Sequence, residues 1–247
     1  MAKTTLQPRD SDVLYYPSEE PDPMGQTGIH FLFISLILDY LRNILLGRKD
    51  FYLISDQFLY YVEGDLTSVL APDVALYFGV AGHPRRVWKT WEEGGKVPDL
   101  AFEVLSDSSA ADLGSKRGTY ASLGVREYVV FDPDGELVPE RVRVYSLVDG
   151  ELERVRPRGA RCWLETVSLW IGVDDGLPKA WRADGTPVAH FEALAETLRE
   201  REGELEASQA ELEASQAELE TSQAELEARG REIEALKARL AELERGR

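Results

Sequence analysis

The spacing of hydrophobic and polar residues changes several times along the first 190 positions, and each change indicates a separate element. Residues 26–46 are strongly apolar over a length that suits a buried helix. Shorter apolar runs bounded by turn residues predict strands at 51–54, 58–62, 73–78, 99–105, 127–131, 141–147 and 151–156. The dipeptide Asp149-Gly150 predicts a hairpin between the last two runs, and Asp184-Gly185 predicts another within residues 181–188.

Two connections in this region carry further signals. The cluster of serines and an aspartate at 106–109 predicts the start of a helix over residues 110–123, and Gly124 fits its C-terminal end. Residues 79–97 form a long loop, and a loop of that length inside a compact domain is usually functional or mobile. The order of helix, strands, helix and strands predicts an α/β fold with a central mixed sheet flanked by helices.

The pattern changes completely after residue 190. Apolar residues then recur at every seventh position, at Phe191, Leu198, Leu205, Leu212, Leu219, Leu226, Ile233 and Leu240. Such a heptad repeat predicts a long C-terminal coiled coil over residues 191–247, roughly 80 Å long at about 1.5 Å per residue. Serine and arginine occupy the other core positions in the middle of the repeat, so a single charged helix is the alternative interpretation.

The charge and the cysteine content limit the binding partners and the cellular compartment that the sequence suggests. Residues 191–247 contain 16 acidic and 8 basic side chains, and residues 1–190 contain 29 and 20, so both parts are acidic. An acidic body disfavours strong non-specific binding of nucleic acid, which would need a local basic strip or metal ions. The single cysteine, Cys162, excludes an intrachain disulfide and suits a reducing cytoplasm.

Neither a signal peptide nor a membrane span is expected. Residues 1–22 are polar and contain prolines, which predicts a flexible N-terminal segment rather than a secretion signal. The longest apolar run, residues 30–46, is too short to cross a bilayer.

The candidate chemistry lies in two carboxylates. Glu103 is placed within an apolar strand, where a charge is costly unless a basic partner or a metal ion neutralises it. Alternate side chains of a strand share a face, so Asp73 and Glu103 converge if their strands are neighbours. Two converging carboxylates favour a divalent cation such as Mg²⁺ or Mn²⁺, which activates water for attack on a phosphate. Lys116, which lies after Glu103 in the sequence, is a nearby cation that would position the attacking water or stabilise the negative charge of the transition state.

Each candidate also has a purely structural interpretation. Glu103 could pair with Lys116 or Arg117 to stabilise the fold, Asp73 could simply open a strand after Pro72, and Lys116 could be a solvated helix residue. Weaker site candidates, each with structural alternatives, are Asp99, Ser106, His30, Arg85, Arg86, Lys89, Trp88 and Trp91. Tyr120 and Tyr128 are expected in the core.

These residues resemble a known family. The quoted motifs are Pro72-Asp73, residues 98–106 (PDLAFEVLS), Lys116, Tyr120, residues 124–128 (GVREY) and Asp132-Pro133. Together they are similar to the Uma-two family of the PD-(D/E)XK restriction-endonuclease-like superfamily, over roughly residues 20–190. The resemblance implies a restriction-endonuclease-like core and a Mg²⁺-dependent phosphodiesterase site, in which Mn²⁺ substitutes.

Within that resemblance, Asp73 matches the aspartate of the PD element and Glu103 matches the acidic residue of (D/E)XK. Both are therefore expected as metal ligands and catalytic residues. The lysine of the pattern is missing, because Leu105 stands two residues after Glu103. Lys116 from the following helix is expected to take its place.

Two hypotheses of function follow. The first is a Mg²⁺-dependent endonuclease that hydrolyses DNA, with residues 23–190 as the nuclease-like domain; the sequence does not distinguish DNA from RNA. The alternative is a non-catalytic scaffold or regulatory protein that uses the nuclease fold and oligomerises through residues 191–247. Both predict self-association, as a homodimer in the simplest case.

Overall fold

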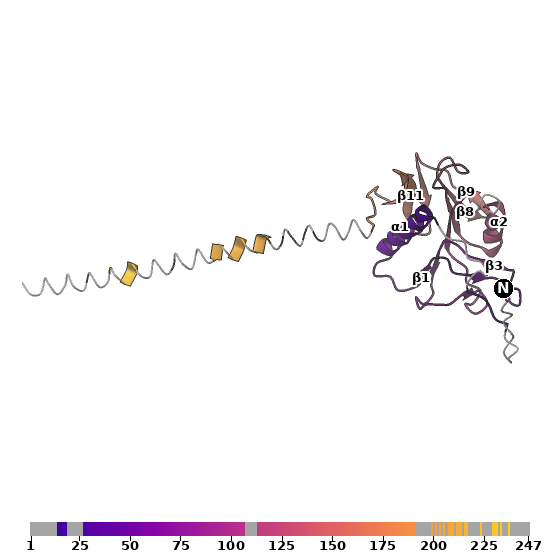
Figure 1. Cartoon of the computed structure of the whole chain (residues 1–247), viewed down its shortest axis with the longest axis horizontal. Helices are drawn as coiled ribbons and strands as arrows, with labels where there is room; N and C mark the ends of the chain where they lie inside the picture. Colours follow the sequence, from indigo (N-terminus) through magenta and orange to yellow (C-terminus); the bar gives the residue numbers. More distant parts are fainter. Residues whose placement is uncertain are drawn as a thin grey trace, which may run out of the picture. The chain divides into compact units, whose positions relative to one another are not determined.

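The computed structural model describes residues 14–18, 27–106 and 113–190, with scattered positions between 199 and 237. The chain divides into two compact units, Met1–His190 and Phe191–Arg247, and each is treated by itself. Figure 1 labels the elements of the first unit. Its helices are α1 (Gly28–Ile44) and α2 (Leu113–Leu123). Its strands are β1 (Phe51–Ile54), β2 (Leu59–Tyr60), β3 (Val69–Leu70), β4 (Val74–Phe78), β5 (Trp88–Lys89), β6 (Leu100–Val104), β7 (Glu127–Phe131), β8 (Val142–Val148), β9 (Glu151–Arg154), β10 (Arg161–Leu164), β11 (Leu169–Asp174) and β12 (Leu177–Arg182).

A six-stranded sheet forms the centre of the unit, in the order β1-β4-β6-β7-β8-β9. Strands β6 and β7 are parallel, and the other neighbours are antiparallel. A parallel pair needs a crossover connection, which here contains α2. The predicted α/β fold with a central mixed sheet and helices is therefore confirmed.

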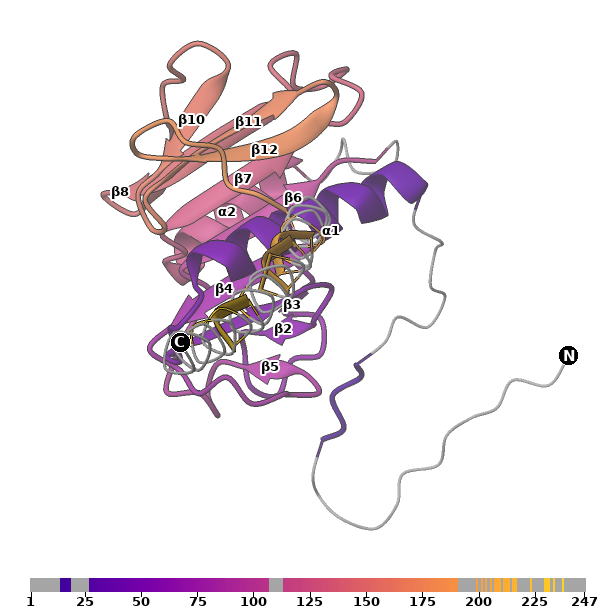
Figure 2. The ribbon, with the colours of Figure 1, turned by 90° about the vertical axis from the view of Figure 1, so that its left-hand side faces the viewer.

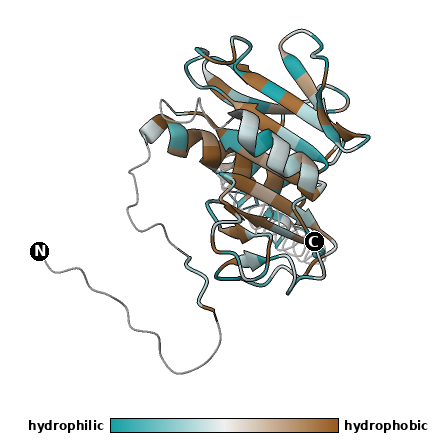
Figure 3. Ribbon diagram, turned by 90° about the vertical axis from the view of Figure 1, so that its right-hand side faces the viewer, coloured by the Kyte–Doolittle hydropathy of each residue, from teal (hydrophilic) through white to brown (hydrophobic). Residues whose placement is uncertain are grey.

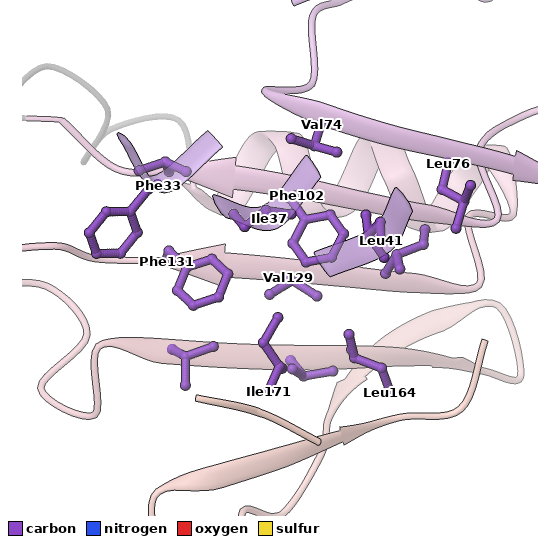
Figure 4. Packing of buried hydrophobic residues seen from close by; sticks show 14 of the residues in the cluster. Phe33, Ile37, Leu41, Val74, Leu76, Phe102, Val129, Phe131, Leu164 and Ile171 are labelled. Carbon is purple, nitrogen blue, oxygen red and sulfur yellow. The ribbon is translucent and has the colours of Figure 1, made fainter. Parts of the chain in front are cut away.

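One face of this sheet is covered by α1 and by a small antiparallel sheet, β10-β11-β12. Figure 2 shows α1 running across the central strands with the small sheet beside it. In Figure 4, Phe33 of α1 lies beside Phe131 and Ile37 lies beside Phe102, while Leu164 and Ile171 belong to the same cluster from the side of the small sheet. These side chains are almost fully buried, so this face forms the main hydrophobic core.

The opposite face of the central sheet is covered by α2 and by a second small sheet, β3-β2-β5. Figure 3 shows the predominantly hydrophobic central strands behind the paler α2. Tyr120 of α2 and Trp88 of β5 are both fully buried in this second core. The odd-numbered residues of β4 and β6 point to this face, which is the face on which the carboxylates lie.

The sequence placed most elements of the central sheet correctly. The first helix begins at Gly28, where the Thr27 side chain accepts a hydrogen bond from the His30 amide and caps it. The predicted hairpin at Asp149-Gly150 joins β8 to β9, with positive φ angles of 51° and 88° at the two turn residues. The second predicted helix begins at Leu113 in the described residues, and the serine cluster before it lies largely outside them.

Two parts of the sequence-based interpretation were wrong. The loop predicted over residues 79–97 contains β5, whose Trp88 is a core residue because it stacks on Tyr77 at a centroid distance of 3.9 Å. The sheet of β10, β11 and β12 was largely missed. The hairpin expected around Asp184-Gly185 is present as a short antiparallel pairing that bridges Trp181 and Pro187. Strands this short depend on the partners that they pair with, which the local pattern does not reveal.

Parts of both ends of the chain are also described. Among residues 14–18, Pro17 accepts a hydrogen bond from the Tyr60 hydroxyl at 2.7 Å. The described positions between 199 and 237 are helical, and Leu205, Leu212 and Ile233 are each more than half exposed. The pairing of this helix into a coiled coil stays a prediction. In the described part of the chain, no helix combines the length and hydrophobicity that a membrane crossing requires.

Candidate active site

Strand pairing brings the two candidate carboxylates together. Strands β4 and β6 pair antiparallel, with Val74 opposite Phe102, so the next position along places Asp73 opposite Glu103. Directly opposed residues of an antiparallel pair share a face and lie about 5 Å apart at Cβ. The convergence expected from the alternation of the two strands is therefore present in the structure.

Glu103 is enclosed by two side chains of α2. The Lys116 ammonium lies 2.8 Å from Glu103 Oε2, and the Tyr120 hydroxyl donates to Oε1 at 2.9 Å. The carboxylate is only 5 % exposed. Burial raises the pKa of Glu103 to about 7; Lys116 opposes this shift, and the charge of Asp73 adds to it. Near neutral pH the site therefore holds a carboxylate that a further cation would stabilise.

Asp73 is held by the backbone and by a histidine from the other side of the sheet. Its Oδ2 accepts a hydrogen bond from the Val104 amide at 2.6 Å, and His30 Nε2 lies 3.4 Å from the same oxygen. His30 Nε2 is also 3.0 Å from the Val104 carbonyl oxygen. Since both neighbours are acceptors, Nε2 carries the proton. The hydrogen bond to Asp73 raises the pKa of His30, while burial opposes the rise.

Lys116 and Tyr120 reach Glu103 because they are four residues apart on one helix, which places them on the same face. Leu105, at the position where the superfamily pattern has its lysine, is buried in the second core. The structure thus places an ammonium beside Glu103 from α2. Tyr120 was expected only in the core, and the four-residue spacing from Lys116 was the signal that could have identified it.

A second tyrosine lies close to the site without a partner. The Tyr128 hydroxyl is buried and makes no hydrogen bond to any described residue. Its ring centroid is 5.0 Å from that of Tyr120. Burial raises the pKa of Tyr128 most strongly, and the negative charge of Glu103 adds to the shift. This hydroxyl is therefore an unused donor at the edge of the site.

The other acidic candidate has a structural role. Asp99 is buried at the start of β6, where it accepts a hydrogen bond from the Phe78 amide and pairs with Lys96 at 2.7 Å. Arg126 lies 3.4 Å from its other oxygen. These partners satisfy the carboxylate at the opposite end of β6 from Glu103. Ser106 is exposed just beyond the end of the same strand.

The basic residues of the 79–97 loop are occupied by other partners. Arg85 pairs with Glu93, and its guanidinium lies 4.8 Å from the Trp88 ring centroid. Lys89 pairs with Glu92 at 2.9 Å. Arg86 instead donates hydrogen bonds to Ser18 and Tyr15, and Trp91 packs against Tyr16. These basic residues, which were weaker site candidates, are therefore engaged by partners away from the carboxylate pair.

The oxygen donors at the site suit a hard divalent cation. Asp73 and Glu103 offer carboxylate oxygens, and the Val104 carbonyl adds a third oxygen close to Asp73. The described residues include no group of three His, Cys, Asp or Glu side chains with the spacing of metal ligands. A cation would therefore be held by the carboxylate pair together with backbone or solvent oxygens, which is a donor set that fits Mg²⁺ or Mn²⁺.

Comparison with known proteins identifies the family. The Uma2 family, described as "Putative restriction endonuclease", matches residues 5–173. No curated protein is significantly similar to the chain. Among solved structures, the chain is similar to "a putative nuclease belonging to DUF820" from Anabaena variabilis, with 18% identity and a TM-score of 0.44. That alignment covers 59% of this chain and 76% of the other. Because the family match spans more than half of the chain and includes Asp73, Glu103 and Lys116, the protein belongs to the Uma2 family.

Proposed function

We propose that this protein is a metal-dependent endonuclease that hydrolyses phosphodiester bonds in DNA, with Mg²⁺ as the metal and Mn²⁺ as a substitute. The family relation supports a nuclease in general. The observation that carries the finer proposal is the opposed pair Asp73 and Glu103 at the ends of neighbouring strands, with the Lys116 ammonium 2.8 Å from Glu103. An acidic pair in which Glu103 is buried and Asp73 is partly buried, with one lysine beside it, is a costly arrangement that binding of a cation and a phosphate would relieve.

In this proposal each residue has a distinct role. Asp73 and Glu103 hold the cation, and the hydrogen bonds from the Val104 amide and the Tyr120 hydroxyl fix the orientation of their carboxylates. A bound divalent cation supplies an activated water molecule and stabilises charge on the phosphate. Lys116 contributes a positive charge beside the developing oxyanion. His30 positions Asp73 by donating a hydrogen bond from Nε2.

The test compares the wild-type protein with Glu103→Gln and Asp73→Asn in the cleavage of supercoiled plasmid and of single-stranded DNA and RNA. Each substrate is incubated with Mg²⁺, Mn²⁺ or EDTA. We expect metal-dependent nicking of DNA by the wild type and its loss in both variants. Calorimetric titration with Mn²⁺ gives a second readout, since both variants should lose binding of the metal.

Asp99→Asn is the matched control. Asp99 is also a buried carboxylate and directly precedes β6, but it lies at the opposite end of that strand from Glu103 and pairs with Lys96. The control should keep both cleavage and Mn²⁺ binding. If Glu103→Gln cleaves like the wild type, or if the wild type binds no metal, the proposed function is wrong.

Self-association forms a separate part of the proposal. The apolar heptad positions Leu205, Leu212 and Ile233 are exposed on a helical segment, which favours pairing of this segment with a second copy. We infer a homodimer, which would supply one active site for each strand of a duplex. We also propose that the protein acts in the reducing cytoplasm, because its single cysteine cannot form an intrachain disulfide. Removal of residues 191–247 should convert a concentration-dependent dimer to a monomer in light scattering. A non-catalytic scaffold, the alternative function, predicts the same dimer but no cleavage.

A further inference from the structure

A nuclease with an acidic body needs a local positive surface for its substrate. Residues 1–190 carry 29 acidic and 20 basic side chains, and the carboxylate pair itself repels phosphate. An open cleft of about 140 Å³ lies on the α2 face of the central sheet. Its lining residues are Gly114, Arg117, Val130, Val138, Arg143 and Tyr145. We call this feature the Arg117–Arg143 cleft.

Strand register connects this cleft to the carboxylate pair. Glu103 of β6 is opposite Val130 of β7, and Val130 is opposite Arg143 of β8. With Asp73 opposite Glu103, four successive strands carry one row of side chains on one face. At about 4.8 Å between strands, Arg143 lies roughly 10 Å from Glu103 across the sheet. A nucleic acid advances about 3.4 Å per nucleotide along its axis, so this separation corresponds to about three nucleotides or fewer.

The cleft has more positive than negative charge. Glu140 accepts hydrogen bonds from both Arg143 and Arg154, at 2.8 and 2.5 Å, so one carboxylate is shared by two guanidinium groups. The Arg117 guanidinium lies 5.2 Å from the Tyr145 ring centroid. Within the described part of the chain, Arg117 has no ion pair with an acidic side chain. Of the two arginines that line the cleft, Arg143 therefore shares the Glu140 carboxylate, whereas Arg117 keeps its positive charge among the described residues.

A buried hydroxyl group between the cleft and the carboxylates also lacks a hydrogen-bond partner among the described residues. The Tyr128 ring lies between the rings of Tyr120 and Tyr145, at centroid distances of 5.0 and 5.9 Å. Tyr120 contacts Glu103, and Tyr145 lines the cleft. Since the Tyr128 hydroxyl is buried and has no described partner, a donor is available where the two regions adjoin.

We propose that the Arg117–Arg143 cleft binds the phosphodiester backbone of the substrate strand, beside the phosphate at which the carboxylate pair acts. Guanidinium groups suit this role, because their planar donors match the oxygens of a phosphate and they stay charged at any physiological pH. The cleft supplies the basic strip that an acidic nuclease requires. This inference rests on the proposed function, because it takes the carboxylate pair as the site of hydrolysis.

The test measures the binding of a short fluorescein-labelled duplex by fluorescence anisotropy, with Ca²⁺ in place of Mg²⁺ to prevent hydrolysis. Arg117→Ala removes an exposed guanidinium and should leave the melting temperature unchanged. We expect the dissociation constant to rise about tenfold, as is typical when a charge-assisted contact is lost. The dependence of the logarithm of affinity on the logarithm of salt should become shallower by about one.

Arg158→Ala is the matched control. Arg158 is also an exposed arginine over an aromatic ring, 5.5 Å from the centroid of Trp170, and it lies next to β10 rather than at the cleft. It should bind the duplex like the wild type. Arg117→Lys keeps the charge but loses the planar fork, so we expect a smaller loss of affinity than with alanine.

The outcomes separate the two proposals. If Arg117→Ala and Arg158→Ala bind equally well, or if the wild type does not bind the duplex, the cleft is not a backbone site. Displacement of the duplex by inorganic phosphate at low concentration would also contradict the inference, since it would indicate a site for free phosphate. If Arg117→Ala weakens binding while the wild type cleaves no DNA, the cleft binds a nucleic-acid backbone but the proposed hydrolysis at the carboxylate pair is wrong.

Discussion

The substitution Glu103→Gln tests the cost of keeping a carboxylate in the second core. Glutamine has almost the shape of glutamic acid and keeps a carbonyl oxygen for the Tyr120 hydroxyl, but it carries no charge. Glu103 is 5 % exposed, and burial dominates the rise of its pKa despite the nearby Lys116. The carboxylate therefore destabilises the folded protein when it is ionised.

The size of this effect follows from the pKa in the two states. The pKa of Glu103 rises from 4.5 to about 7 on folding. Stability from this group is fully present below the lower value and is lost as the pH rises through the upper one. At about 1.4 kcal/mol per pKa unit, the rise from 4.5 to about 7 corresponds to a loss of about 3.5 kcal/mol above pH 7. We therefore expect Glu103→Gln to be about 3 kcal/mol more stable than the wild type at alkaline pH without metal.

The assay is urea denaturation in EDTA at about pH 5 and pH 8, which bracket the titration of Glu103. The advantage of Glu103→Gln should be below about 1 kcal/mol at the acidic pH, where the folded carboxyl group is already protonated. In thermal melts at the alkaline pH it should amount to several degrees for a domain of this size. A variant less stable than the wild type at alkaline pH would refute this reasoning, because the Lys116 ion pair would then outweigh the cost of burial.

Three further predictions concern neighbouring residues. Tyr120→Phe removes the hydroxyl that donates to Glu103 and should destabilise the protein by about 2 kcal/mol in urea denaturation at alkaline pH. Asp73→Asn removes the main interaction that raises the pKa of His30, so this pKa should fall in an NMR titration of the imidazole. Trp88→Ala removes a fully buried ring stacked on Tyr77 and should cost about 3–5 kcal/mol, measured in the same urea assay.

The local pattern of hydrophobic and polar residues was sufficient to predict much of the central sheet. The alternation around Glu103 placed it on the same face as Ala101, and the Asp149-Gly150 pair marked a hairpin that the structure contains. These features depend on neighbouring residues, since side chains alternate along any strand and a tight turn requires positive φ angles. Trp88 was harder to place, because an aromatic residue in a glycine-rich loop has the same local signature whether it is buried or exposed.

For the site, the sequence by itself determined the residue types and the faces that they occupy. It identified Glu103 because a charged residue in an apolar strand is locally anomalous, and it added Asp73 and Lys116 through the strand alternation and the family resemblance. Their proximity depended on the antiparallel register of β4 and β6 and on the crossover through α2. His30 reached Asp73 only because α1 packs across the opposite face of the sheet.

The Arg117–Arg143 cleft depended entirely on tertiary structure. Among the arginines and lysines, the sequence offered Arg85, Arg86 and Lys89 as weaker site candidates, and these residues have other partners in the structure. Arg117 and Arg143 lie on different elements, and only the packing of α2 over β7 and β8 places them around one cleft. The alternation of side chains along a strand is a local property of the backbone. The pairing of distant strands instead minimises the free energy of the whole domain, so the alternation alone does not predict which strands pair.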